Sequence, residues 1–132
     1  MRIIFLLLGL IWISGCVSNK SSVNNADTNK YIERISIDEF GSEDAEQIFN
    51  KSRDHVILLK KIDRGPGFPH VAEIVVLDLK AKRVIYKESV IGGRVTWQDD
   101  DIIKIKRTPD ARSKDQEENE KSAFKQIDVR KL

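Results

Sequence analysis

Three apolar segments, His55-Val-Ile-Leu-Leu-Lys-Lys-Ile62, Val71-Ala-Glu-Ile-Val-Val-Leu-Asp-Leu79 and Arg83-Val-Ile-Tyr-Lys-Glu-Ser-Val-Ile91, follow one another with short polar or glycine-containing breaks. Each segment is rich in β-branched residues and is bounded by turn-forming residues, which predicts three strands. Leu79–Arg83 predicts a hairpin turn. Gly92-Gly93 predicts a tight turn, because glycine adopts positive φ without a Cβ clash.

The chain after Gly93 continues the same pattern. Arg94–Gln98 and Asp101–Arg107 predict two further strands that reverse at the aspartates between them. A polar excursion runs from Thr108 to Lys121, and its mixed charges over Lys114–Lys121 indicate a solvated loop. Ala123–Arg130 predicts the last strand. Short strands separated by turn signals indicate an antiparallel meander.

The segment before His55 carries the other predicted elements. Tyr31–Ile37 alternates in its second half, which predicts a strand. Ser42 is a suitable N-cap for a short helix that ends near Arg53, with acidic residues in its first turn. Ala45, Ile48 and Phe49 give this helix one apolar stripe. The expected fold class is therefore α+β, a small antiparallel sheet or open barrel of five to seven strands with one short helix.

Composition excludes several function classes. The 23 lysines and arginines nearly balance the 21 aspartates and glutamates, so net charge does not point to nucleic acid or to anionic lipid. Cys16 is the only cysteine, so the fold is expected to have no disulfide and to depend on its apolar core.

The amino-terminal segment indicates export. Arg2 precedes the apolar run Ile3–Ile13, which would rise about 16 Å as a helix, about half of a bilayer's hydrocarbon thickness. This length and the small residues that follow are typical of a secretory signal. Ile13-Ser14-Gly15-Cys16 also resembles the lipobox of bacterial lipoproteins, in which an aliphatic residue and two small residues precede the modified cysteine.

The resemblance implies that residues 1–15 are a cleaved signal peptide and that Cys16 carries acyl chains that anchor the protein in the membrane. A conventional cleaved signal or an uncleaved anchor is the alternative. Val17 does not match the aspartate that retains many lipoproteins in the inner membrane, so the outer membrane is the expected location. Residues 16–30 are expected to form the lipidated cysteine and a flexible polar tether. Residues 31–132 are expected to form a single β-rich domain.

Gly65-Pro66-Gly67-Phe68-Pro69-His70 is the most distinctive loop of the chain. Two prolines stiffen it, and Phe68 and His70 are candidate residues for binding a partner, because an aromatic side chain on a rigid loop is a good anchor. The preferred interpretation is nevertheless a hairpin connection in which Phe68 folds back as a lid on the core. Trp97 is a second candidate for partner binding, and a large core residue is the preferred interpretation for it.

Asp99-Asp100-Asp101 is the densest acidic cluster. Consecutive aspartates do not converge on a cation unless a loop wraps them, so a solvated hairpin tip is preferred over a metal site. His55 and His70 have no neighbouring nucleophile motif.

The sequence therefore predicts a protein that is not an enzyme, has no cofactor and acts as a binding or assembly module for another envelope protein. The open alternatives are an inhibitor or immunity-type lipoprotein that blocks an envelope-targeting enzyme or toxin, and a small hydrolase that uses the aspartates with a histidine.

Overall fold

The computed structural model describes residues 25–107 and 123–132. The predicted leader, Cys16, most of the predicted tether and the polar excursion lie outside these residues. None of the described helices is long and apolar enough to cross a membrane. The elements are α1 (Asn25–Phe40), β1 (Glu46–Phe49), β2 (His55–Ile62), β3 (Val71–Asp78), β4 (Arg83–Ile91), β5 (Arg94–Trp97), β6 (Ile102–Lys106), β7 (Phe124–Asp128) and a terminal 3-10 turn at Val129–Lys131.

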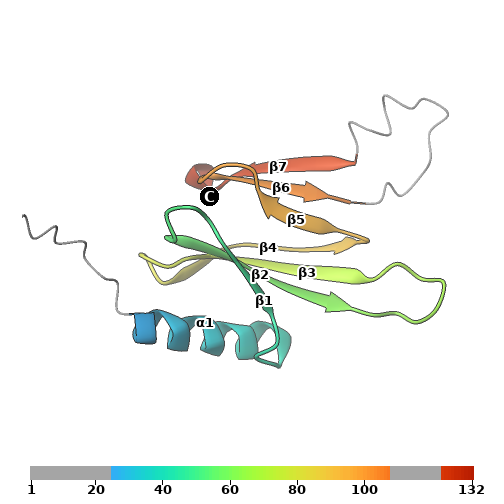
Figure 1. Cartoon of the computed structure of the whole chain (residues 1–132), viewed down its shortest axis with the longest axis horizontal. Coiled ribbons are helices and arrows are strands. Elements are labelled where there is room, and N and C mark those ends of the chain that lie inside the picture. The colour runs from blue at the N-terminus through green and yellow to red at the C-terminus, as the bar shows by residue number, and fades with distance from the viewer. Residues whose placement is uncertain (1–24, 108–122) are drawn as a thin grey trace, which may run out of the picture.

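The elements form three layers, with α1 below a four-stranded sheet and a three-stranded sheet above it (Figure 1). Sheet A has the order β1-β2-β3-β4, sheet B has the order β5-β6-β7, and every pairing is antiparallel. The α+β class with one α-helix and antiparallel strands is confirmed for the described residues. The strands form two separate sheets that do not close into a barrel.

Sheet A is covered on both faces, which explains its continuous apolar runs. Ile57 and Ile74 belong to the core between the two sheets, whereas Leu58 and Val75, their neighbours in sequence, pack toward α1. Successive side chains of a strand point to opposite faces, so a strand covered on both sides needs apolar residues at every position. The continuous apolar runs of β2 and β3 are thus explained by the position of sheet A between α1 and sheet B.

The two elements predicted between Tyr31 and Arg53 have the wrong secondary structure. Tyr31–Ile37, predicted as a strand, belongs to helix α1, which begins at Asn25 within the predicted tether. Tyr31, Ile32 and Ser36 are buried at helical spacing, whereas Ile37 is 44% exposed. The alternation that suggested a strand is therefore incidental, and the buried set follows the helical period of 3.6 residues.

The predicted helix from Ser42 to Arg53 is also wrong. Glu46–Phe49 forms β1 and pairs with Val56–Leu59 of β2. Ser42, the predicted N-cap, instead accepts a hydrogen bond from Lys60 Nζ at 3.1 Å, and its carbonyl accepts one from Ser36 Oγ at 2.9 Å. The backbone hydrogen bonds offered by the neighbouring strand outweigh the weak helix signals of this short segment.

The Gly92-Gly93 turn moves the chain from sheet A to sheet B. A Cβ at Gly93 would lie 2.1 Å from Val90 Cγ2, so only glycine permits this close approach. β4 and β5 are therefore consecutive in sequence but belong to different sheets, which corrects the single meander that the turn signals suggested.

Candidate functional site

The β2–β3 loop carries the predicted binding residues Phe68 and His70. Phe68 N–H donates to the Gly65 carbonyl at 3.3 Å, and Gly67 has a φ of 83°, so Gly65–Phe68 forms a tight turn with Pro66 and Gly67 at its centre. Gly65 N–H donates to Asp63 Oδ1 at 2.9 Å and fixes the start of the turn. The loop is therefore ordered by its own local hydrogen bonds.

His70 fastens this loop to the turn between the sheets. Its carbonyl accepts from Gly92 N–H at 2.8 Å, and its Nε2 lies 3.3 Å from the Gly93 carbonyl oxygen. Phe68 is 63% exposed, with the Arg64 guanidinium 5.9 Å from the centre of its ring. Phe68 therefore does not fold back as a lid on the core, and the preferred interpretation of this side chain is wrong. His70 holds the loop that carries Phe68 against the Gly92-Gly93 turn.

An exposed apolar row lies at the base of the loop. Ile62, Val71 and Ile91 are direct partners in the register of β2, β3 and β4, so they lie side by side on one face of sheet A. Ile62 is 38% exposed and Ile91 is 42% exposed. We call Ile62, Phe68, Val71 and Ile91 the distal surface.

The distal surface is uncovered because α1 ends too early to reach it. Gly41, with a φ of 70°, donates to the Ile37 carbonyl at 2.8 Å and terminates the helix. Lys60 Nζ donates to the Phe40 carbonyl at 2.8 Å, and Ile62 lies two residues farther along the same face of β2. Figure 1 shows the β2–β3 loop projecting beyond this end of the helix.

An open groove of about 350 Å³ borders the distal surface. It lies between the end of α1 and strands β3 and β4, where Glu39, Phe40, Glu73, Lys87 and Ser89 line it. Lys87 and Glu39 form an ion pair across it. Glu73 and Ser89 each lie two residues from Val71 and Ile91 on the same face. The groove therefore supplies a charged rim next to the apolar row.

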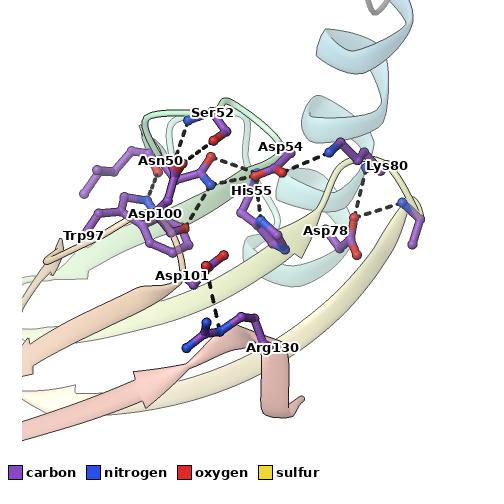
Figure 2. A network of polar contacts seen from close by, with 12 residues as sticks. Asn50, Ser52, Asp54, His55, Asp78, Lys80, Trp97, Asp100, Asp101 and Arg130 are labelled. Atoms are coloured by element: carbon purple, nitrogen blue, oxygen red, sulfur yellow. Dashed lines mark hydrogen bonds and ion pairs between the residues drawn. The ribbon is translucent and has the colours of Figure 1, made fainter.

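The other predicted site residues lie together at the opposite end of the sheets (Figure 2). Trp97 packs against the core between the sheets, and its Nε1 donates to the Ile48 carbonyl at 2.8 Å. The His55 ring lies 6.2 Å from the Trp97 ring. Trp97 therefore fits the core interpretation and joins β5 to β1.

The aspartate turn between β5 and β6 holds the two sheets together. Asp100 Oδ1 accepts from Ser52 N–H at 2.8 Å, and Ser52 Oγ donates to the second carboxylate oxygen. The Asp101 carbonyl accepts from Val129 N–H at 2.9 Å, and its carboxylate lies 3.8 Å from Arg130. No group of three or more potential metal ligands is present in residues 25–107 and 123–132. The acidic turn is occupied by contacts within the protein.

Asn50 lies at the centre of the contact between the two sheets and is 3% exposed. Its Nδ2 donates to Asp54 Oδ1 at 2.6 Å and to the Asp100 carbonyl at 3.0 Å, while its Oδ1 accepts from His55 N–H at 3.0 Å. We call Asn50, Ser52, Asp54, His55 and Asp100 the inter-sheet clasp.

The clasp also changes the acidity of Asp54. Burial alone raises its pKa, but hydrogen bonds from Asn50, His55 and Lys80 outweigh burial and lower the pKa from 3.8 to about 2. Lys80 Nζ lies 3.1 Å from Asp54 Oδ2, and His55 Nδ1 lies 2.8 Å from Oδ1. The carboxylate is thus stabilised in its charged form.

The Asp54→Asn variant is expected to be less stable than wild type by about 2 kcal/mol at pH 6. The lowered folded-state pKa stabilises the protein above the unfolded-state pKa near 4, and this stabilisation is lost as the pH falls toward 2. Urea unfolding at several pH values should show the difference shrinking over that interval. Asp44→Asn, which removes an exposed carboxylate, is the matched control. A difference that does not change with pH would contradict the prediction.

A second polar contact joins the sheets beside β4. Lys125 Nζ of β7 donates to Tyr86 Oη at 2.9 Å and lies 3.0 Å from Glu88 Oε1 of β4. The hydrogen bonds that Lys125 donates to the Tyr86 hydroxyl and to the Glu88 carboxylate raise its pKa. Burial raises the pKa of Glu88, and hydrogen bonds from Tyr86 and Lys125 lower it below its usual value. Both groups therefore remain charged near neutral pH.

Sequence reasoning identified the loop but missed Ile62, Val71 and Ile91. Each is the terminal residue of its strand, and only the pairing register shows that the three are adjacent. The position of the helix end, which leaves them uncovered, was also mispredicted. The glycines that bracket Pro66 were the signal that did identify the loop.

No protein-family model, curated protein or solved structure matches the chain.

Proposed function

We propose that this protein is a lipid-anchored, non-enzymatic binding module of the bacterial envelope that contacts another envelope protein through the distal surface. The observation that carries the proposal is the exposure of Phe68, at 63%, on a loop that is fastened at both ends and joins Ile62 of β2 to Val71 of β3. The anchoring part of the proposal rests on the lipobox-like Ile13-Ser14-Gly15-Cys16.

The chemistry of the distal surface fits a protein partner. Burying an exposed large apolar side chain contributes about 2 kcal/mol, and interface energy concentrates in a few such anchors. Because the loop is already ordered, little conformational entropy is lost when a partner covers Phe68. The charged rim formed by Glu39 and Lys87 supplies polar contacts around the apolar centre.

The position of the distal surface also supports the proposal. The chain enters the described domain at Asn25, the first residue of α1, and a helix of 16 residues is about 24 Å long. In Figure 1 the β2–β3 loop, which carries Phe68, projects beyond the other end of α1. An anchor at Cys16 would therefore hold the domain at one end and present Phe68 at the opposite end, toward neighbours in the envelope. Confinement near the membrane raises the effective concentration for such contacts.

The proposal is tested with a photo-crosslinking phenylalanine analogue at position 91 of the full chain, produced in its own host. We expect one discrete crosslinked protein species. Adding Phe68→Ala is expected to reduce its yield about tenfold or more, because truncating a central aromatic anchor costs about 2 kcal/mol of binding. The thermal midpoint of the variant should change little, because the side chain is exposed.

Leu132→Ala is the matched control, because Leu132 is a 44% exposed apolar residue at the opposite end of the molecule in Figure 1. It should leave the crosslink unchanged. Equal losses for both variants, or crosslinks to phospholipid alone, would contradict the proposal. If the crosslinked protein were a secreted lytic enzyme or toxin, the inhibitory role would be assigned.

A further inference from the structure

The outer face of sheet B gathers positive charge. Arg94, Lys106 and Phe124 form one row across β5, β6 and β7, and Lys104 lies in the next row between Thr96 and Gln126. Val95, Ile103, Ile105 and Ile127, which alternate with these residues along the strands, fill the core between the sheets. The three cations and Phe124 therefore point away from the core, and we call them the cationic face.

The charges of the cationic face are not compensated within the described chain. No carboxylate of residues 25–107 or 123–132 forms an ion pair with Arg94, Lys104 or Lys106. Arg94 and Lys106 are direct cross-strand partners, and like charges in that position destabilise a sheet. Arg94 and Lys106 thus form a like-charge pair that no carboxylate of the described residues compensates.

Phe124 organises the lysines of this face. Lys104 Nζ lies 4.3 Å from the centre of its ring and Lys106 Nζ lies 5.8 Å from it. Phe124 itself is 41% exposed. The two ammonium groups are therefore held around one aromatic ring by cation–π attraction, and their remaining hydrogen-bond donors are available to a ligand.

We propose that the cationic face binds a carboxylate-rich segment of the partner protein. This inference rests on the proposed function and specifies the chemistry of the partner. Three cations without an ion-pair partner in residues 25–107 and 123–132, beside an exposed aromatic ring, complement a chain that alternates carboxylates with small or apolar residues. The cationic face begins at Arg94, three residues after Ile91 of the distal surface. The cationic face lies on the outer face of sheet B, whereas the row of Ile62, Val71 and Ile91 lies on the α1 side of sheet A (Figure 1). One partner would therefore have to extend around this end of the domain to place an apolar residue against Phe68 and its acidic segment across sheet B.

The geometry favours a protein over anionic lipid as the occupant. Sheet B is the layer farthest from α1, and the row of Arg94 lies at the end of the molecule away from Asn25 (Figure 1). The nine residues from Cys16 to Asn25 span about 30 Å when fully extended. To place the cationic face on the anchoring membrane, this segment would have to pass both α1 and sheet A (Figure 1), which restricts its conformations.

The test measures binding of a fluorescein-labelled octaglutamate peptide to the detergent-solubilised full chain by anisotropy at low salt. Lys104→Gln with Lys106→Gln is expected to weaken binding about tenfold, since each exposed charge pair contributes up to about a factor of five. The matched control, Lys30→Gln with Lys51→Gln, makes the same change in net charge at exposed lysines of α1 and of the β1–β2 hairpin. It should retain wild-type binding.

The double variant on sheet B should fold. Removing the Lys106 charge relieves its repulsion with Arg94, whereas the two substitutions also remove the cation–π contacts with Phe124, so the opposing effects should leave the thermal midpoint within about 4 °C of wild type. Equal weakening in both double variants, or no binding of octaglutamate by wild type, would overturn the inference. So would lysine-dependent binding to phosphatidylglycerol vesicles without binding to the peptide. These outcomes leave the Phe68-dependent crosslink intact, so the proposed function is tested separately.

Discussion

The Cys16→Ala chain is expected to carry no acyl chains and to lose stable attachment to the membrane. Intact-mass measurement of the membrane fraction should show a wild-type species that begins at Cys16 and bears the added acyl mass. Each buried CH₂ contributes about 0.8 kcal/mol, so the two or three chains of a lipoprotein anchor far more firmly than one, which binds only marginally. The loss of membrane attachment in the Cys16→Ala variant should therefore be close to complete.

A leader retained on the variant would not replace this anchor. Its apolar run Ile3–Ile13 would rise about 16 Å as a helix, about half of the hydrocarbon core. Ser18→Ala, a substitution of similar size just outside the lipobox-like motif, should behave as wild type. A wild-type protein that lacks acyl mass would contradict the lipoprotein interpretation and, with it, the tethering mechanism.

The Asn50→Ala variant is expected to lose about 3 kcal/mol of unfolding free energy. The substitution removes a buried side chain that makes three hydrogen bonds, and it leaves His55 N–H and the Asp100 carbonyl without these partners. Each unsatisfied buried group costs about 1–3 kcal/mol. Because Asp100 belongs to the turn of sheet B and Asn50 to the hairpin of sheet A, the loss also weakens the contact between the sheets. Denaturant unfolding at neutral pH measures the difference.

Two comparisons make the Asn50 prediction specific. Asn50→Asp preserves the shape and the acceptor for His55 N–H but replaces the donors with a carboxylate oxygen facing Asp54, so it should be at least as destabilising. Asn29→Ala, at an exposed position of α1, should change stability by less than about 0.5 kcal/mol. A loss below about 1 kcal/mol for Asn50→Ala would mean that the clasp contributes little to stability.

The strands from His55 onward were predictable because their signals are local. Val56–Leu59 and Ile74–Leu77 are continuous runs of strand-forming residues, and Leu79–Arg83 and Gly92-Gly93 mark the turns. The same runs did not reveal two sheets, because a strand covered by a helix and a strand covered by a second sheet have the same apolar pattern. The separation depends on the close approach at Gly93, which is visible only in three dimensions.

The first part of the chain was mispredicted because its signals are weak and its boundary was misplaced. Assigning Asn25–Lys30 to the tether removed the first turns of α1 and left too short a segment for the helical period to be evident. Glu46–Phe49 becomes a strand through its pairing with β2, a contact between segments that propensity does not capture.

The candidate site was only partly predictable for a related reason. The glycines and prolines of the loop identified it from sequence, but they did not show whether Phe68 folds back on the core, and its exposure corrects the preferred interpretation. The adjacency of Ile62, Val71 and Ile91, and that of Arg94, Lys106 and Phe124, requires the register of three strands. The register of paired strands depends on turn geometry and on how the apolar side chains of all strands pack together, so it could not be predicted from these local segments.

The parallel course of α1 and the strands of sheet A has a mechanical consequence (Figure 1). A force between an anchor before Asn25 and a partner held at Phe68 would act along the long axis of the domain. It would load the packing of Tyr31 and Ile32 against Leu58 and Val75 in shear, so that these contacts must give way together and not one after another. A lengthwise pull therefore loads the helix–sheet interface in the direction in which its contacts resist together, which is the loading that the proposed link between a membrane and a neighbouring protein would produce.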